Sequence, residues 1–237
     1  MTPRIATVVA LVAHVGLGAA SNVLFLAAFQ FRPEWFLDPA LVISGGTTSA
    51  EFLKWAALTD LFSYYLPTAV VALALWVALR HRGPALAMAA TGAALGFAFA
   101  GGSAAAVLAM AGAPLVAEAA QPGADLAALT IAFRILVDVV FHAIWQLLDG
   151  ILLTAWFVGT GLLLRADQPG LGRLGLVLGA FTGAATVLNV VGVGILRDVV
   201  LGAGFGLWAV WSVWLAVLVW RRRSPFDRLD PAADHGA

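Results

Sequence analysis

The sequence predicts an all-α membrane protein, a bundle of six transmembrane helices. Hydrophobic residues make up 62% of the 237 residues and charged residues only 11%, whereas soluble domains contain about 45–50% apolar and about 25% charged residues. The mean hydropathy is +0.96. The apolar residues also gather into six runs that are long enough to cross a bilayer core of about 30 Å. Because lipid offers no partner to backbone N–H and C=O groups, each run is predicted to be helical.

The six runs form a single predicted domain, residues 1–220, followed by a short tail at residues 221–237. Charged residues, proline or glycine close each run. The runs are residues 5–29, 55–79, 85–113, 137–164, 174–196 and 199–220. Two connecting segments, residues 30–51 and 114–128, are long, and we expect them to be irregular loops.

The first run has the features of either a signal peptide or a transmembrane helix. Arg4, the apolar residues after it and the small residues at positions 18–20 fit a cleavable signal peptide. The apolar run continues through residues 23–29, however, which is longer than the apolar region of a signal peptide. We therefore predict an uncleaved first helix.

The second run contains a proline well inside its length. Pro67 has no N–H to donate and its ring clashes with the preceding turn, so it is expected to kink or locally unwind the helix. The carbonyl group of Ser63 would then be free for another partner.

The third and fifth runs carry small residues at every fourth position, which lets helices approach closely in lipid. In the third run these are Gly92 and Gly96. In the fifth they are Gly175, Gly179 and Gly183. We predict contact faces within one bundle, with a homo-oligomer through Gly175, Gly179 and Gly183 as the alternative.

The fourth run carries a polar stripe. Arg134, Asp138, His142 and Gln146 are spaced by four residues, and Asp149 follows three residues later. At 100° per residue all five lie within about 120° of arc on an α-helix. Arg134 and Asp138 are explained by a solvated helical extension with i, i+4 pairs. Asp149 is not, because a carboxyl group below the interface needs a partner, a cavity or a proton.

The sixth run contains a row of tryptophans, Trp208, Trp211 and Trp214. Such a row either packs against the glycine-rich helices or lines a ligand cavity. Packing is the simpler interpretation. The lone His14 in the first run is likewise interpreted as a neutral, hydrogen-bonded packing residue.

Basic residues near the run ends predict the orientation. With both termini in the cytoplasm, nine arginines lie inside and four basic residues lie outside, which satisfies the positive-inside rule. The three arginines at positions 221–223 are part of this signal, and contact with lipid phosphates is the alternative. The scarcity of lysine and the abundance of Ala, Gly, Leu and Val are typical of a GC-rich bacterial genome, so we expect the bacterial cytoplasmic (inner) membrane.

Composition also excludes several functions. The chain has no cysteine, which removes disulfides, thiolate metal sites and cysteine nucleophiles. Thirteen basic residues balance thirteen acidic ones, so no basic field is left to attract nucleic acid. Lys54, the single lysine, lies at a helix end and so cannot form a mid-membrane Schiff base. We expect no cofactor.

Polar residues from several runs are predicted to lie at one depth. Counted at about 1.5 Å per residue from the basic residue at the cytoplasmic end of each run, four of them lie about 24–30 Å up. Polar groups within spans mark candidate functional sites. The predicted outward-facing cavity is lined by Asn22, Asp60, His142, Gln146, Asp149 and Asn189.

The order of these features resembles the uncharacterised six-helix bacterial membrane proteins of the domain-of-unknown-function 4386 family. The similar stretches are residues 52–54 through 59–61 opening the second run, residues 79–80 closing it, and residues 159–165 followed by 173–175. The resemblance implies a six-helix bundle with both termini inside. It implies no activity and no site residues.

Three functions remain open from the sequence. Binding or transport of a small solute or ion is favoured by the polar groups at matching depth and by the broken second helix. A scaffold, sensor or accessory subunit is the alternative. A metal-dependent hydrolase using Asp138, His142 and Asp149, with Asp60 as a further ligand, has less support because it offers one histidine.

Overall fold

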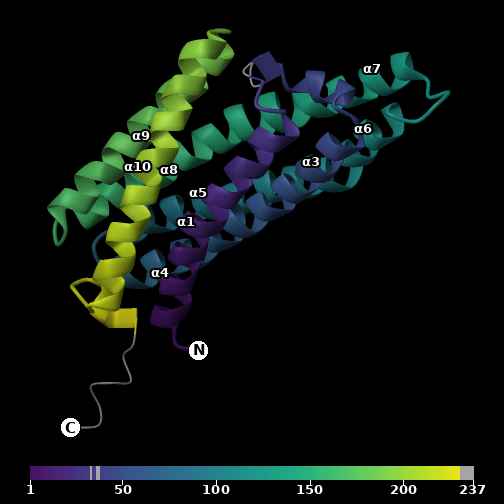
Figure 1. Cartoon of the computed structure of the whole chain (residues 1–237). Coiled ribbons are helices and arrows are strands. Elements are labelled where there is room, and N and C mark those ends of the chain that lie inside the picture. The colour runs from purple at the N-terminus through teal and green to yellow at the C-terminus, as the bar shows by residue number, and fades with distance from the viewer. Residues whose placement is uncertain (33, 36–37, 230–237) are drawn as a thin grey trace.

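The computed structural model describes residues 1–32, 34–35 and 38–229, and every regular element in that part of the chain is helical (Figure 1). It contains six helical spans long and apolar enough to cross a membrane, as the sequence predicted. Their parts are α1 (Pro3–Ala28), α3 (Gly46–Asp60) with α4 (Leu66–Leu79), α5 (Pro84–Val107) with α6 (Ala113–Ala119), α7 (Leu126–Val137) with α8 (Asp149–Leu164), α9 (Pro169–Val190) and α10 (Gly194–Trp220).

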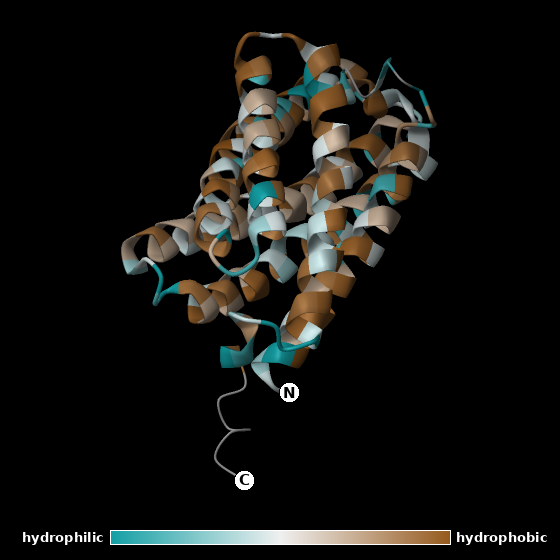
Figure 2. Ribbon diagram, turned by 90° about the vertical axis from the view of Figure 1, so that its left-hand side faces the viewer, coloured by the Kyte–Doolittle hydropathy of each residue, from teal (hydrophilic) through white to brown (hydrophobic). Residues whose placement is uncertain are grey.

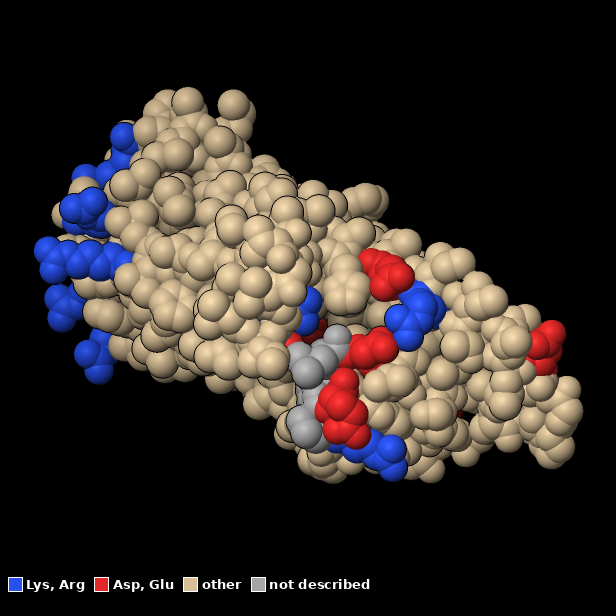
Figure 3. All heavy atoms as spheres, turned by 90° about the horizontal axis from the view of Figure 1, so that it is seen from above, with Lys and Arg blue, Asp and Glu red and all other residues tan. Residues whose placement is uncertain are grey.

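The start of α1 and the end of α10 lie at the same end of the bundle, which we call the terminal end; the opposite end is the far end (Figure 1). Hydrophobic residues lie along the length of the helices, and hydrophilic ones gather mainly at the turns and the two ends (Figure 2). Seen from above, basic side chains crowd one end of the molecule and the acidic ones lie toward the other (Figure 3).

The second, third and fourth spans are longer than predicted, with 34, 36 and 39 residues. The segments expected to be irregular loops are largely helical: the 3₁₀ turn Pro39–Ser44 precedes α3, and α6 and α7 extend the third and fourth spans. The Asp125 side chain accepts from the backbone N–H of Ala128 and so caps α7. A separate hydrophobic core, which includes Trp35, Leu53 and Phe133, packs these extensions together.

Each of the three long spans is interrupted by a π-helical segment. These are Leu61–Tyr65 between α3 and α4, Leu108–Gly112 between α5 and α6, and Asp138–Leu148 between α7 and α8. The first confirms the local unwinding predicted from Pro67, and the Ser63 carbonyl it frees lies 3.1 Å from His14 Nδ1. Because a carbonyl oxygen only accepts, His14 Nδ1 donates this bond.

The glycine face of α9 packs within the chain. A side chain at Gly175 would meet the backbone of Gly161 at 3.2 Å, and one at Gly179 would meet Val158 at 2.6 Å, both on α8. Gly183 lies against Thr154 of the same helix. The predicted intramolecular contact is confirmed, and the alternative of a homo-oligomer through this face stays a prediction.

Two tryptophans of the predicted row on α10 lie in the main core. Trp208 and Trp211 are buried against Trp156 and Phe157, with ring centroids 5.4–6.1 Å apart. Trp214 is 41% exposed, although its ring covers Gly170. The row is therefore a packing face.

Candidate functional site: an arginine groove at the far end

A groove of about 500 Å³ lies where the far ends of α9 and α10 meet the π-helical segment Asp138–Leu148. We call it the arginine groove. Its lining combines polar and apolar groups from three helical spans: His142, Leu188, Asn189, Gly192, Gly194, Ile195 and Arg197.

Arg197 is the central charged residue of the arginine groove, and only 5% of the residue is exposed. Its Nε donates to Asp198 Oδ1 at 2.7 Å, and its Nη1 donates to Gln146 Oε1 at 2.9 Å and Asn189 Oδ1 at 3.3 Å. No described residue accepts from Nη2, which lies beside Gly194 in the groove wall. Two nitrogens of a buried guanidinium are thus held by the protein, and the third has no acceptor among the described residues although Arg197 lines the groove.

The turn before α10 explains how a buried arginine comes to lie here. The α9 helix ends in a Schellman motif, in which the N–H of Val193 donates to the Leu188 carbonyl and that of Gly192 to the Asn189 carbonyl. Gly192 has φ +76°, a conformation that favours glycine. The chain therefore reverses at once, and α10 begins at Gly194.

Sequence reasoning missed Arg197 because it placed this residue in a loop between runs ending at 196 and beginning at 199. The structure instead puts Arg197 in the first turn of α10. Gly192, a glycine just beyond the last polar residue of the fifth run, was the available signal, since glycine is the preferred residue after a helix C-terminus.

His142 and Gln146 reach the arginine groove from the π-helical segment. His142 Nδ1 donates to Gln146 Oε1 at 2.7 Å, and the carbonyl of His142 accepts from Asn189 Nδ2 at 3.2 Å. One oxygen of Gln146 thus accepts from both His142 and Arg197. These contacts fix the guanidinium and the imidazole relative to each other.

The electrostatics of the arginine groove favour an anion. Arg197 is the charged residue of the lining, and no described carboxylate is part of it. The N-terminus of α10 opens at Gly194 without a side-chain cap, so its first N–H groups carry partial positive charge toward the groove. Asp198 pairs with Nε on the other side of Arg197.

A second polar cluster, the buried acid cluster, lies deeper in the bundle and joins α1, the second span and α8. Ser21 Oγ lies 3.1 Å from both Asp60 Oδ1 and the Ala56 carbonyl oxygen. Tyr65 OH donates to Asp149 Oδ2 at 3.3 Å, while Asp149 Oδ1 is buried with no hydrogen-bond partner in the described structure. No described lysine, arginine or histidine pairs with either carboxyl group.

The structure therefore divides the six residues predicted to share one cavity. His142, Gln146 and Asn189 meet at the arginine groove. Asp60 and Asp149 lie in the buried acid cluster. Asn22 faces neither, since its Nδ2 donates to the Gly18 carbonyl and to Tyr64 OH.

The ligand set expected for a metal hydrolase is also divided. His142 Nε2 lies 3.9 Å from Asp138 Oδ1, but Asp149 faces Tyr65 instead of these two. The described residues contain no group of three His, Asp or Glu side chains placed to hold a metal ion.

Comparisons of the chain with protein-family models, curated proteins and solved structures find no match. The resemblance to the six-helix family stays a prediction. Function is therefore inferred from the arginine groove and its surroundings.

Proposed function

We propose that this chain is a multi-pass protein of the bacterial inner membrane that binds a small anionic solute in the arginine groove, on the outer side. Carboxylate, phosphate and sulfate share the chemistry that the groove recognises, a compact oxyanion with several hydrogen-bond acceptors. The observation that carries the proposal is the buried guanidinium of Arg197, whose Nη2 has no acceptor among the described residues.

A buried guanidinium is costly unless its donors are satisfied. Here Asp198, Gln146 and Asn189 satisfy Nε and Nη1 and hold the side chain rigid. Since Arg197 and the uncapped N-terminus of α10 line one groove, an oxyanion would receive donors from both. Preorganised donors of this kind lose little entropy on binding.

The outward orientation is supported by the basic residues. Nine arginines gather at the terminal end or in the tail, against three arginines and Lys54 toward the far end. By the positive-inside rule, this distribution favours a cytoplasmic location for both termini and an outer location for the arginine groove.

Transport of the bound anion is the second candidate function, and the π-helical segment favours it. This segment begins at Asp138, carries His142 and Gln146 and ends immediately before Asp149 of the buried acid cluster. One irregular segment thus supplies residues to the arginine groove and leads directly into the buried acid cluster. Because π-helical segments within α-helices are frequent at functional sites, a shift in it on anion binding would move Asp149.

The test measures binding of phosphate, sulfate and small mono- and dicarboxylates by calorimetry to the purified protein in neutral detergent. We expect at least one of them to bind, and Arg197→Gln to weaken it at least tenfold, because that change removes the free donor edge. The matched control is Arg134→Gln, which removes an exposed far-end arginine paired with Asp38. This control should bind as the unaltered protein does.

A lipid phosphate is distinguished from a soluble anion by repeating the measurement in nanodiscs. If no soluble anion binds in detergent and anionic lipid occupies the arginine groove in nanodiscs, the ligand is a lipid headgroup. That result would contradict a solute-binding role. Equal loss of affinity in the Arg134→Gln and Arg197→Gln proteins would contradict the assignment to the arginine groove.

A further inference from the structure

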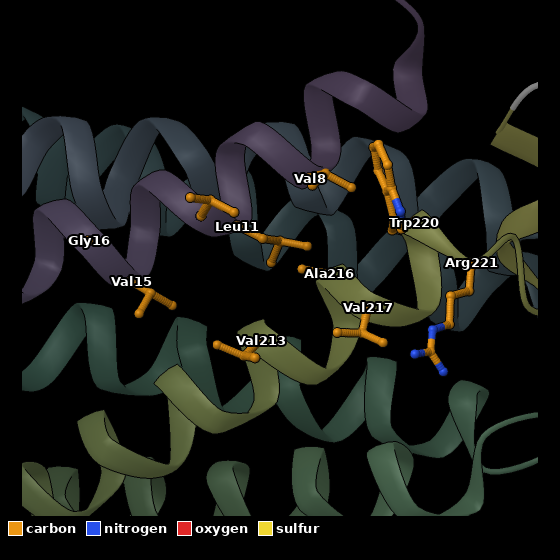
Figure 4. A pocket seen from close by; sticks show the side chains of 10 residues that line it. Val8, Leu11, Val15, Gly16, Val213, Ala216, Val217, Trp220 and Arg221 are labelled. Carbon is orange, nitrogen blue, oxygen red and sulfur yellow. The ribbon is translucent and has the colours of Figure 1, made fainter.

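A second groove, of about 580 Å³, lies between α1 and α10 in the terminal half of the bundle (Figure 4). We call it the apolar groove. It is lined by α1 from Val8 to Gly16 and by α10 from Val213 to Arg221, and Arg221 is the charged residue of the lining. It lies at the opposite end from the arginine groove and plays no part in the function proposed above.

Short side chains create the apolar groove. Facing residues on the two helices are valine, alanine and glycine at most positions, and in Figure 4 Val15 and Val213 lie across an open gap from each other. A Cβ added at Gly16 would have no heavy atom within 4 Å. The protein therefore leaves this space unfilled on a side that faces lipid.

The length of the apolar groove matches one leaflet of a bilayer. From Val213 to Arg221 the α10 helix rises about 12 Å, and from Val8 to Gly16 the α1 helix rises by the same amount. Half of a hydrocarbon core is about 15 Å. A helix from a second copy would cross the whole core, whereas a single acyl chain ends near the middle, where this groove ends.

The charge at the groove mouth matches a lipid phosphate. Trp220 and Arg221 lie together at the terminal end of the groove (Figure 4). The Arg4 guanidinium stacks over the Trp220 ring at 5.8 Å, and the Arg221 guanidinium has no ion-pair partner among the described residues. Tryptophan and arginine at this level are typical of the membrane–water interface.

We propose that the apolar groove binds one acyl chain of an anionic phospholipid from the leaflet at the terminal end, and that Arg221 binds its headgroup phosphate. The acyl chain fills the space between α1 and α10 that their short side chains leave open. Arg221, the first of the three consecutive arginines, thus contributes to a lipid site in addition to the orientation signal.

The test is native mass spectrometry of the full chain released from nanodiscs containing equal amounts of phosphatidylglycerol and phosphatidylcholine. We expect one phosphatidylglycerol to remain on each chain after mild delipidation. Gly16→Leu fills the groove and should reduce this bound population at least fivefold. Arg221→Gln should abolish the preference for phosphatidylglycerol over phosphatidylcholine.

Two variants serve as matched controls. Gly202→Leu makes the same change on α10 at another position with no heavy atom within 4 Å, and Arg80→Gln removes another exposed arginine of the terminal end. Both should retain the lipid. The proposal is overturned if the Gly16→Leu protein retains phosphatidylglycerol or if the Arg221→Gln protein keeps its lipid selectivity. It is also overturned if the unaltered protein is a dimer and Gly16→Leu dissociates this dimer without releasing a lipid.

Discussion

At the scale of single residues, the buried acid cluster depends on a glycine of the third span. A Cβ at Gly101 would overlap both the Tyr65 ring and the Asp149 carboxyl group. The Gly101 carbonyl also accepts from Trp145 Nε1 at 3.2 Å. The absence of a side chain at this position is what allows Tyr65 and Asp149 to meet inside the bundle.

We therefore expect Gly101→Ala to lower stability by about 1–3 kcal/mol, the usual cost of overpacking a filled core. Thermal unfolding in detergent measures this as a lower Tm. Gly92→Ala is the matched control, because a Cβ there has no heavy atom within 4 Å. Equal melting temperatures for the two variants would show that the residues around Gly101 accommodate a Cβ without loss of stability.

The sequence predicted which polar residues meet at the arginine groove only in part, and the reason is geometric. Residue counting gives depth along a helix, and it put Gln146 and Asn189 at one level, where both accept from Arg197. It put His142, which also joins them, nearer the outer surface. It gives direction around the helix only while the winding is regular. The π-helical segment winds less per residue than the 100° assumed, so Asp149 faces Tyr65 and not the arginine groove.

At the scale of elements, the π-helical segments set how the two halves of each long span are rotated relative to each other. In the second span, residues 61–65 hold the Ser63 carbonyl toward His14 and follow directly after Asp60, which faces Ser21. The sequence marked this position through Pro67. Pro114 follows the segment Leu108–Gly112 by two residues, as Pro67 follows Leu61–Tyr65, but it lies just beyond the run predicted to end at residue 113. The segment Asp138–Leu148 has no proline beside it, and its apolar residues fit an α-helix as well.

Deleting Phe62 tests the π-helical winding of the second span. Removing one residue restores α-helical winding, because four residues at about 100° each cover nearly the arc that five residues cover in a π-helix. The flanking helices then keep their relative rotation, but the Ser63 carbonyl bonds within the helix and leaves the buried His14 without its acceptor. We expect a marked fall in Tm. Phe62→Ala is the control that keeps the chain length, and since Phe62 is 54% exposed it should change stability little. If deletion and substitution melt alike, the π-helical winding contributes nothing to the packing.

At the scale of the whole molecule, the six spans and the gathering of basic residues at one end were predictable from composition and spacing alone. The lengths of the second, third and fourth spans were not predictable. Hydropathy shows where an apolar run ends, whereas a helix continues to its capping residue. Asp125 caps α7 well before the apolar run predicted to begin at residue 137. The three extended spans then bury a core of their own.

The absence of cysteine makes the orientation directly measurable. A thiol at Gln121→Cys, in the turn between α6 and α7, should react with a membrane-impermeant maleimide in intact cells. Ser224→Cys, at the start of the tail, should react only after the membrane is opened. Both positions are exposed, so the comparison reports sidedness. The opposite labelling pattern would place the arginine groove in the cytoplasm and contradict the proposed function.

The unequal spans have a consequence for the surrounding lipid. At about 1.5 Å per residue the second, third and fourth spans are about 51–58 Å long and α9 is about 33 Å long, so no single bilayer thickness suits all six standing upright. The long spans slant away from α1 and α10 (Figure 1). The bilayer around this protein is therefore expected to be deformed unevenly. It should keep nearly its resting thickness beside α9 and change its thickness beside the second, third and fourth spans, where the helices tilt or protrude.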